Sequence, residues 1–546
     1  MTELIKNNQK KWKKTHSCGE LNKKNIQQQV CLMGWVNSRR DHGGLIFVDL
    51  RDREGKTQVV FDPKISQEAH NTAHKIRNEY VIAVIGEVIP RGEGLVNPNL
   101  KTGEIEVKVK CIKILNQSEP LPFSVDEYSE IGEDLRLKYR YLDLRKPDMK
   151  KNIITRHKVS QAIRNFLDKK GFLDIETPFL TKSTPEGARD YIVPSRVNPG
   201  KFYALPQSPQ LFKQLLMVSG FERYFQIVRC FRDEDLRADR APEFTQLDME
   251  LSFIDRDELF DLIEDLMIHL FQEILNVKIK KPFPRYDYNE VISRYGIDKP
   301  DLRYGMEIHD LNQIFKKTEF KIFSNIVAED GKIGALKTEK PDTFSRKNID
   351  DLNDFVRSFG LAGLSYIRFK KDDSIQSSIG KYISSDEIAQ IKEEMQAVAG
   401  DLIFIVAGSS EQVAQTMGML RIKIAKNLNL IEKNSYKFLW VANFPLFEYS
   451  PTEKRYTSMH HPFTAPVEKD IPLLETDPYQ VKSKAYDLVL NGNEIGGGSI
   501  RIHQTELQQK IFNLLGIKPQ EAERKFGFLL EALKFGAPPH GGIAFG

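Results

Sequence analysis

The sequence predicts a multidomain α+β protein with an N-terminal β-barrel, a larger domain built on an antiparallel sheet, and an α+β domain inserted into the larger one. The length of 546 residues is too great for one compact core and suggests three or four domains. Short β-rich runs recur between Val30 and Asn116. A strongly charged stretch from Phe231 to Glu250 lies between a strand-like apolar run and a helical pattern.

The N-terminal region contains five β-rich runs, which are VCLMGWVNSRR, GGLIFVDLRD, KTQVVFD, YVIAVIGEVI and GEIEVKVKCIKIL. Between the third and the fourth, ISQEAHNTAHKIRNE predicts one helix. Five strands with a helix in that place indicate an OB-fold, a barrel that commonly binds oligonucleotides on one face. The last run alternates between apolar and charged side chains. Its core-facing residues are expected to be Ile105, Val107, Val109 and Cys111.

Composition excludes several classes of protein. With 80 Lys and Arg against 76 Asp and Glu, the net charge of +4 does not by itself indicate a nucleic-acid binder. The four cysteines are far apart and form no CxxC pair, so neither a zinc site nor a disulfide framework is expected. The basic N-terminus lacks the apolar segment of a signal peptide, and no apolar run is long enough to span a bilayer. We therefore expect a cytoplasmic protein.

The charged stretch FRDEDLRADRAPEFTQLDME is flanked by strand-like runs, which predicts the tip of an antiparallel hairpin. Such a charge run is more often a solvated surface loop. Charges held on a rigid hairpin can instead be directed at a ligand. An arginine at its start can bind an α-phosphate with two hydrogen bonds, and a carboxylate two residues later can accept from an adenine amino group.

This stretch resembles motif 2 of class II aminoacyl-tRNA synthetases, and in detail that of bacterial aspartyl-tRNA synthetases. GFLDIETPFL resembles motif 1 of this family, and NGNEIGGGSIR matches its pattern NGxExGGGSxR. The likeness extends from about Gly34 to Gly546. It implies a homodimeric enzyme, with Pro178 at the dimer interface, that uses ATP and Mg²⁺ to attach L-aspartate to tRNA through an aspartyl-adenylate. Neither DNA nor a membrane is expected as a partner.

The resemblance also implies the residues of the active site. Those expected to bind aspartate are Glu186, Ser208, Gln210, Lys213, Arg232, Gln246, Asp248, His460 and Arg501. Those expected to bind ATP are Arg232, Asp233, Glu234, Glu494 and Gly546, and Mg²⁺ is expected on Asp487 and Glu494. The glycines between Glu494 and Arg501 would let a ligand approach the backbone closely.

Selection of aspartate requires cations. Gln210 and Lys213 share one face of the helix predicted over LFKQLLMV. The planar fork of Arg501 and the point charge of Lys213 would both lose their anionic partner if asparagine were bound instead, at a cost of several kcal/mol. The histidine pair in TSMHHPF has no third metal-type partner, so a metal site there is rejected.

In the family the barrel recognises the anticodon, and the matching positions are Arg40, Phe47, Gln58 and Glu106. From spacing alone Phe47 fits the core equally well. Two loop residues, His42 and Gly94, match those that accompany enzymes charging both tRNA-Asp and tRNA-Asn, so we expect both tRNAs to be substrates. The alternative is that they are ordinary turn residues of a strictly discriminating enzyme.

The predicted domains are an OB-fold anticodon-binding domain (1–120), a first catalytic part with motifs 1 and 2 (121–302), an inserted GAD domain (303–432) and a second catalytic part (433–546). The chain stops at GGIAFG, before the Asp-Arg pair with which motif 3 continues in the family. We therefore expect a C-terminal truncation within motif 3 and weaker ATP binding, since that arginine binds the γ-phosphate.

Two other functions remain open. One is a tRNA-binding protein deficient in amino-acid activation, and it is supported only by the absent arginine. The other is an asparaginyl- or lysyl-type synthetase, against which Arg501, the PQSPQLFK run and the large insertion all argue.

Overall fold

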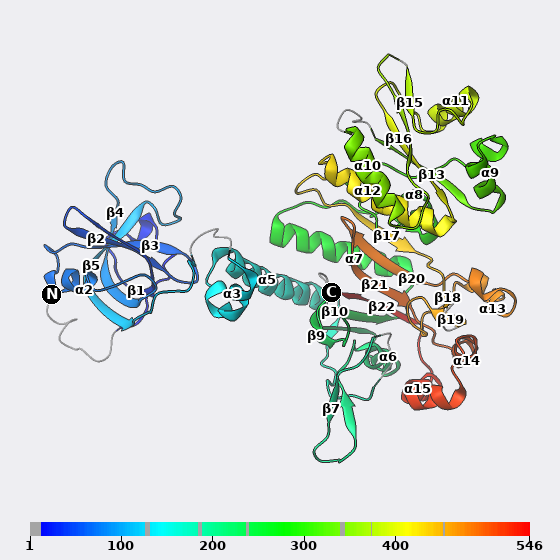
Figure 1. The fold of residues 1–546 in the computed structure, drawn as a ribbon. Helices are drawn as coiled ribbons and strands as arrows, with labels where there is room; N and C mark the ends of the chain where they lie inside the picture. The colour runs from blue at the N-terminus through cyan, green and yellow to red at the C-terminus, as the bar shows by residue number, and fades with distance from the viewer. Residues whose placement is uncertain are drawn as a thin grey trace. The chain divides into compact units, whose positions relative to one another are not determined.

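The computed structural model describes residues 12–125, 131–183, 188–235, 240–338, 344–372, 374–450 and 454–546. The chain forms two compact units, residues 1–155 and residues 156–546 (Figure 1). None of the described helices is both long and apolar enough to cross a membrane. The finer domain division at residues 120, 302 and 432 stays a prediction.

The first unit is built on the predicted five-stranded barrel, which is closed in the order β1-β2-β3-β5-β4. Its strands are β1 (Gln29–His42), β2 (Leu45–Arg51), β3 (Lys56–Phe61), β4 (Val81–Pro90) and β5 (Ile105–Asn116). The predicted helix between the third and fourth strands is α2 (Gln67–Ala73). Alternate apolar side chains fill the barrel because successive residues of a strand face opposite sides.

The predicted alternation of β5 holds only for its first half. Ile105, Val107 and Val109 are fully buried, but Cys111 is only half-buried. The register shifts where Ile85 pairs with Cys111 and the next residue of β4 pairs with Val109, so one residue of β5 is unpaired there. A bulge of this kind reverses which residues face the core, and Ile112 and Ile114 pack against the core after it.

Three helices follow the barrel: α3 (Glu133–Lys138), α4 (Arg140–Asp143) and α5 (Pro147–Lys169). Within the first unit, buried Glu79 accepts from Arg51 at 2.7 Å and from Arg145 at 2.7 Å. The ion pair with Arg145 attaches the connection between α4 and α5 to the barrel.

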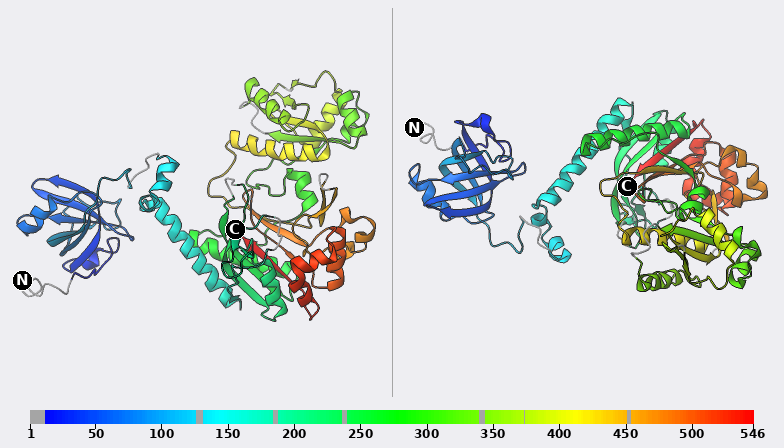
Figure 2. Two further views of the ribbon diagram at one scale, coloured as in Figure 1. Left: turned by 60° about the horizontal axis from the view of Figure 1, so that its bottom comes forward. Right: turned by 90° about the horizontal axis from the view of Figure 1, so that it is seen from above.

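The second unit contains an eight-stranded, largely antiparallel sheet in the order β11-β17-β20-β21-β22-β10-β9-β6 (Figure 2). The strands are β6 (Leu173–Asp174), β9 (Arg223–Phe231), β10 (Glu243–Ser252), β11 (Arg285–Asp287), β17 (Phe438–Ala442), β20 (Ala485–Leu490), β21 (Asn493–Ile500) and β22 (His540–Phe545). The remaining elements around it are β7 (Ile192–Pro194), β8 (Phe202–Ala204), α6 (Gln210–Val218), α7 (Arg256–Leu270), the π-helical turn η2 (Phe271–Leu275), α8 (Tyr288–Tyr295), β18 (Phe447–Ser450), β19 (Arg455–Ser458), α13 (Leu473–Thr476), α14 (Thr505–Leu514) and α15 (Pro519–Leu533).

The central strand β10 shows how the two faces of this sheet differ. Leu247, Met249 and Leu251 point into a core that α5 and α7 cover. Asp248 and Glu250 alternate with them and therefore face the other side, where α6 packs. The sheet thus has one apolar face and one face that carries buried charges.

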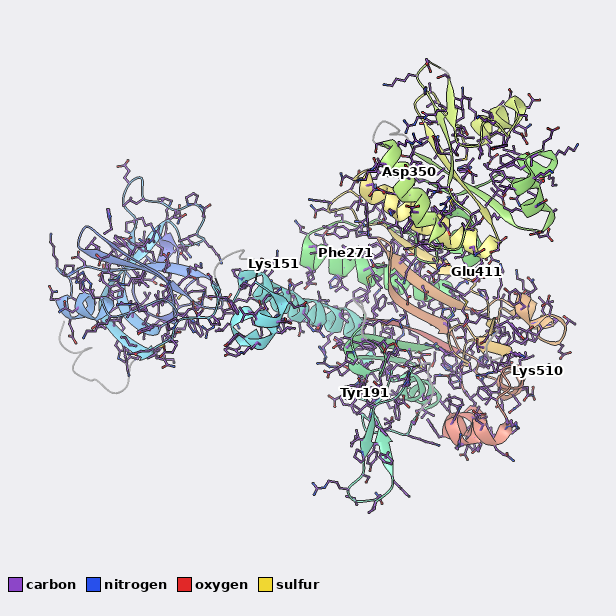
Figure 3. All side chains as sticks on the ribbon, viewed as in Figure 1. Lys151, Tyr191, Phe271, Asp350, Glu411 and Lys510 are labelled. Carbon is purple, nitrogen blue, oxygen red and sulfur yellow. The ribbon has the colours of Figure 1, made fainter. Side chains whose placement is uncertain are left out.

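The predicted insertion forms its own five-stranded sheet, in the order β12-β13-β16-β14-β15. Its strands are β12 (His309–Asp310), β13 (Lys332–Thr338), β14 (Ser365–Phe369), β15 (Ile375–Ser377) and β16 (Leu402–Gly408). Helices α10 (Arg346–Arg357) and α12 (Ser410–Asn427) cover one face, and α9 (Lys321–Ala328) and α11 (Ser385–Glu394) cover the other. In Figure 3 the side chains of Asp350 on α10 and Glu411 on α12 mark this inserted part.

Candidate active site and RNA-binding face

The charged stretch contains the predicted antiparallel pair of strands, with Phe231 of β9 opposite Glu243 of β10, and its residues 236–239 lie outside the described residues. Just beyond β9, the Arg232 backbone N–H donates to Pro242 O at 2.9 Å, which closes the base of the tip. The Arg232 guanidinium lies 5.1 Å from the ring of Phe244, and its Nε has no hydrogen-bond partner among the described residues. Arg232 is therefore held in place with a donor available for a ligand.

The two acidic residues that follow Arg232 are exposed. The backbone N–H of Asp233 donates to Arg189 O at 3.0 Å. The Glu234 carboxylate accepts from Arg240 Nη1 at 3.3 Å across the tip. An exposed pair of this kind contributes little to stability, so Glu234 can exchange Arg240 for a ligand donor at low cost.

Four charged side chains form a buried cluster, with Lys213 from α6, Asp248 and Glu250 from β10, and Arg501 just after β21. Lys213 Nζ lies 2.7 Å from Asp248 Oδ1 and 3.2 Å from Glu250 Oε2. Arg501 donates from Nε to Glu250 Oε1 at 2.9 Å and from Nη2 to Oε2 at 3.2 Å. Each of the four is at most 3% exposed. Buried charges persist only when paired, so this cluster fixes the positions of both cations.

The two carboxyl groups of the cluster titrate differently. Burial raises the pKa of Asp248, although the charge of Lys213 opposes that effect. Burial would also raise the pKa of Glu250, but the charges of Arg501 and Lys213 hold it at about 2. Glu250 is therefore the permanent anion between the two cations.

The structure changes the expectation for Arg501. Its Nε–Nη2 edge, the planar fork that the sequence assigns to substrate, already binds Glu250. Its remaining nitrogen, Nη1, lies 2.6 Å from His461 Nε2 and donates to Ser499 Oγ at 2.8 Å. Arg501 can therefore offer a substrate carboxylate only Nη1, in exchange for His461 or Ser499, and not the whole fork.

The two histidines of the pair have different surroundings. His461 is the one that contacts Arg501, whereas the ring of His460 packs edge-on against Phe444 at 4.8 Å. Burial, with a contribution from the Arg501 charge, lowers the pKa of His460 to about 4. Both rings are half-buried and close to the cluster.

The other predicted aspartate ligands lie on the elements that build the cluster. Gln210 begins α6 and is buried, and its Nε2 has no partner within the described part of the chain. Ser208 Oγ accepts from the Gln210 backbone N–H at 3.3 Å, and Gln246 Oε1 accepts from the Cys230 thiol at 3.3 Å. Glu186 lies outside the described residues.

Asp487 and Glu494 are brought together by the β20–β21 hairpin. Asp487 is opposite Gly497, where a Cβ would lie 2.6 Å from Asp487 Oδ1 and 3.3 Å from Glu494 Oε1. Burial and the charge of Glu494 together raise the pKa of Asp487 well above its usual value. Two carboxylates that face one another across a glycine fit a divalent cation.

A cation on Asp487 and Glu494 would need further ligands from a substrate. Among the described residues, no group of three or more His, Cys, Asp or Glu side chains could hold a metal by itself. Mg²⁺ is commonly bound by one or two carboxylates together with substrate phosphates. Asp487 and Glu494 fit that arrangement.

The three glycines of the triplet have different surroundings. A Cβ on Gly496 would lie 2.5 Å from the ring of Phe545, and one on Gly498 would lie 2.0 Å from Gly542 O. At these two positions a side chain would clash with the neighbouring strand β22. Gly497 is the member of the triplet where a side chain would instead meet the two carboxylates. Gly546, a predicted ATP ligand, directly follows β22.

The four predicted anticodon residues lie on one side of the barrel. Arg40 is the cross-strand partner of Phe47, and Phe47 is half-buried between the fully buried Ile46 and Val48. Arg40 Nη2 donates to Gln58 Oε1 at 3.3 Å, and Gln58 Nε2 donates to Glu106 Oε2 at 2.8 Å. The structure thus places Phe47 outside the barrel core, next to a chain of polar groups.

Two further predicted positions lie in turns of the barrel. His42 is exposed at the end of β1, directly before Gly43 and Gly44, whose φ values are +61° and +78°. Gly94 has φ +75° in an exposed loop after β4. Positive φ explains the glycine at 94 on conformational grounds alone, whereas nothing in the local backbone requires histidine at 42.

Pro178 is exposed in the loop after β6, and the side chains that follow it, Phe179 and Leu180, are 44% and 55% exposed. The β7–β8 hairpin protrudes from the same unit (Figure 1) and exposes Ile192 and Phe202 by 62% and 58%.

Sequence reasoning assigned no role to Glu250, which the structure places at the centre of the cluster. The signal was present, because Gln246, Asp248 and Glu250 are spaced by two on one predicted strand and therefore share a face. Gly542 was also missed. A Cβ there would lie 2.0 Å from Glu250 Oε2, so the buried carboxylate requires glycine on the adjacent strand.

This geometry can be compared with known proteins. Residues 132–546 match the family described as tRNA synthetases class II (D, K and N), and residues 30–115 match the OB-fold nucleic acid binding domain. The chain belongs to the class II tRNA synthetases. The use of ATP follows from this class.

The relatives narrow the comparison within that class. The chain is 55% identical over 98% of its length to the Aspartate--tRNA(Asp/Asn) ligase of Desulfatibacillum aliphaticivorans, covering 89% of that protein. It is 53% identical to the protein of the same name from Syntrophotalea carbinolica, with 98% of this chain and 90% of that one covered.

Solved structures support the fold. The asparaginyl-tRNA synthetase from Pyrococcus horikoshii complexed with asparaginyl-adenylate aligns with a TM-score of 0.59 at 19% identity, covering 98% of this chain and 93% of that one. The aspartyl-tRNA synthetase from Entamoeba histolytica aligns with a TM-score of 0.58 at 19% identity, covering 98% and 87%.

Proposed function

We propose that this protein attaches L-aspartate to tRNA through an aspartyl-adenylate, and that it charges both tRNA-Asp and tRNA-Asn. The observation that carries the proposal is the buried cluster in which Glu250 and Asp248 fix Lys213 and Arg501, next to a hairpin that presents Arg232. The close relatives named Aspartate--tRNA(Asp/Asn) ligase support the choice of amino acid and of both tRNAs.

The first reaction joins aspartate to AMP. An oxygen of the aspartate α-carboxylate attacks the α-phosphorus of ATP, and pyrophosphate leaves with the electron pair of the broken bond. Arg232 has an unpartnered Nε and lies at the base of the hairpin tip, so we assign it to the α-phosphate and the attacking carboxylate. Such a reaction needs positioning and charge neutralisation and no protein nucleophile.

Asp487 and Glu494 would hold Mg²⁺ together with the ATP phosphates, where the ion would neutralise phosphate charge. Glu234 exchanges its exposed partner Arg240 for the adenine amino group. In the second reaction the terminal ribose 3′-hydroxyl of the tRNA attacks the aspartyl carbonyl and AMP leaves.

Aspartate is distinguished from asparagine by Lys213 and by the Nη1 side of Arg501. Both are buried, so a neutral amide in place of the carboxylate would leave their charges poorly compensated at a cost of several kcal/mol. Gln210 Nε2, buried and without a partner in the described residues, is a further donor for the substrate.

The barrel is proposed to bind the anticodon through Phe47, whose ring is half-buried, and through the chain Arg40–Gln58–Glu106. Half-exposed aromatic rings stack splayed bases, and polar groups beside them accept or donate to base edges. We assign His42 and Gly94, each in a turn of the barrel, to the choice between the two tRNAs.

We further propose a homodimer through the loop of Pro178 and the β7–β8 hairpin. Its support is the exposed apolar surface of Phe179, Leu180, Ile192 and Phe202. Sedimentation equilibrium tests this: a monomer at micromolar concentration would refute it. As a tRNA-charging enzyme the protein is placed in the cytoplasm, where charged tRNA is used.

The decisive experiment is pyrophosphate exchange with aspartate, asparagine and lysine in parallel, followed by aminoacylation of tRNA-Asp and tRNA-Asn transcripts. We expect exchange with aspartate only and aspartylation of both transcripts. No exchange with any amino acid would favour an activation-deficient tRNA-binding protein, and charging of tRNA-Asp alone would refute the relaxed specificity.

A further inference from the structure

The segment that leads into the inserted domain, residues 296–306, lies against the hairpin that carries Glu494. Strands β20 and β21 are joined by Asn491 and Gly492, whose φ values are +53° and +81°. A Cβ on Gly492 would lie 3.2 Å from the Cβ of Asp301. The lead-in segment therefore contacts the turn directly, two residues before Glu494.

The inserted domain holds this segment from its other side. Arg421 of α12 is fully buried, and its Nη2 donates to Asp301 O at 2.7 Å and to Tyr304 O at 2.9 Å. Gly296 also packs directly against α12, because a Cβ on Gly296 would lie 2.2 Å from Ala414 O. The lead-in segment is thus clamped between the β20–β21 turn and α12.

The side chain of Asp301 fixes the local conformation. Its carboxylate accepts from Arg303 Nη2 at 2.6 Å and from the Arg303 backbone N–H at 2.9 Å. A carboxylate that binds its own chain two residues further on forms a rigid turn. The residues directly before Asp301 therefore follow a fixed path to the β20–β21 turn that Asp301 contacts.

Lys299 lies in this clamped segment, two residues before Asp301. It is exposed and forms no direct ion pair or hydrogen bond with another described residue. Its charge acts on both Asp487 and Glu494, and the opposite charge of Asp298, its neighbour in the chain, acts on the same two carboxyl groups. Lys299 is therefore a cation without an ion pair, as far as the described residues go, at the Glu494 side of the site.

We propose that Lys299 binds the β- and γ-phosphates of ATP and the pyrophosphate that they become. This inference rests on the proposed function and extends it to a residue of the segment that carries the inserted domain. ATP brings about four negative charges towards a pair of carboxylates, so it needs cations besides Arg232, which is assigned to the α-phosphate. A lysine ammonium is a compact point charge suited to phosphate oxygens. Because Lys299 has no ion pair among the described residues, none has to be broken before it binds phosphate.

During adenylate formation Lys299 would act on the leaving group. As the new bond to the α-phosphorus forms, the bond to the bridging oxygen breaks and its electron pair stays with pyrophosphate. The Lys299 ammonium would stabilise this added negative charge. The inserted domain would thereby contribute to ATP binding without itself entering the aspartate pocket.

The test measures equilibrium binding and not turnover. Isothermal titration calorimetry in the presence of MgCl₂ compares ATP, inorganic pyrophosphate and an aspartyl-sulfamoyl-adenosine, which mimics the adenylate and lacks the β- and γ-phosphates. The proteins are the wild type, Lys299→Ala, Lys299→Arg and, as a control, Lys278→Ala. Lys278 is an exposed lysine of the same unit without an ion-pair partner among the described residues.

We expect Lys299→Ala to weaken the binding of ATP and of pyrophosphate about tenfold, which corresponds to the loss of one charged hydrogen bond. The affinity for the adenylate mimic should not change. Lys299→Arg should retain most of the affinity for ATP, and Lys278→Ala should match the wild type. Equal weakening of ATP and the mimic by Lys299→Ala would show a merely structural role, and unchanged ATP binding would also overturn the proposal. A wild type that binds ATP but not the mimic would refute the proposed function and not the role of Lys299.

Discussion

Glu250 is expected to be essential although it is assigned no contact with substrate. Glu250→Gln removes the anion between Arg501 and Lys213 while keeping the shape of the side chain and one hydrogen bond. The two cations are at most 3% exposed, so neither can turn to water for compensation.

The magnitude follows from the contacts. At 2.9 Å from Arg501 and 3.2 Å from Lys213, each charge pair amounts to roughly 5 to 6 kcal/mol in Coulomb energy with an effective dielectric constant of about 20. The substitution also removes the desolvation cost of the carboxylate, which offsets part of this loss. We therefore expect a net destabilisation of about 3 to 5 kcal/mol, the range for breaking a buried pair.

The assay combines stability with activity. Calorimetry should show a lower unfolding temperature for the second unit. Pyrophosphate exchange should show a higher KM for aspartate, because Arg501 is no longer held in position. The control is Glu243→Gln on the same strand, whose exposed pair with Arg229 at 2.8 Å should contribute no more than about 1 kcal/mol.

A double-mutant cycle tests whether Glu250 acts through Arg501. If Glu250 acts through Arg501, the losses from Glu250→Gln and Arg501→Met should be strongly non-additive. Additive losses, or a Glu250→Gln variant as stable as Glu243→Gln with an unchanged KM for aspartate, would show that the cluster does not position the site.

Three further predictions follow from individual residues. Arg232→Ala should reduce aspartate-dependent pyrophosphate exchange about a thousandfold, because one arginine serves both reacting groups, and should leave tRNA binding by the barrel intact in a filter-binding assay. The pKa of His460 is about 4 in the folded protein against an ordinary 6.5, so the unfolded chain binds the proton more readily. The stability that His460 contributes as a neutral ring is fully present above pH 6.5. It is lost, by up to about 3 kcal/mol of the free energy of unfolding, as the pH falls towards 4. His460→Gln should therefore flatten the decrease of the melting temperature over that range. His42→Leu should shift aminoacylation towards tRNA-Asp and away from tRNA-Asn.

Each of these has an outcome that contradicts it. Exchange by Arg232→Ala within tenfold of the wild type would remove Arg232 from the reaction. If the melting temperature of His460→Gln depends on pH as that of the wild type does, other groups cause the dependence. The matched control is His157→Gln, at an exposed histidine of α5. A His42→Leu variant with unchanged preference for the two transcripts would exclude His42 from the discrimination.

The local features of this protein could be predicted from its sequence. Alternation placed Ile105, Val107 and Val109 in the barrel core, and flanking strand-like runs identified the hairpin around Arg232. Helical spacing put Gln210 and Lys213 on one face of α6. These predictions succeeded because the period of a strand or a helix depends on residues close together in the chain.

Only the tertiary structure decided how distant charges pair. Glu250 and Arg501 are 251 positions apart, and whether Arg501 presents its fork to substrate or to Glu250 depends on which strands are neighbours in the sheet. The bulge that turns Cys111 out of the core arises from the pairing of β4 with β5, which no alternation within β5 encodes. The position of Asp301 against the β20–β21 turn likewise depends on Arg421, more than a hundred residues later. Ion pairing and strand register are set by contacts in space, and a local pattern in the sequence contains neither.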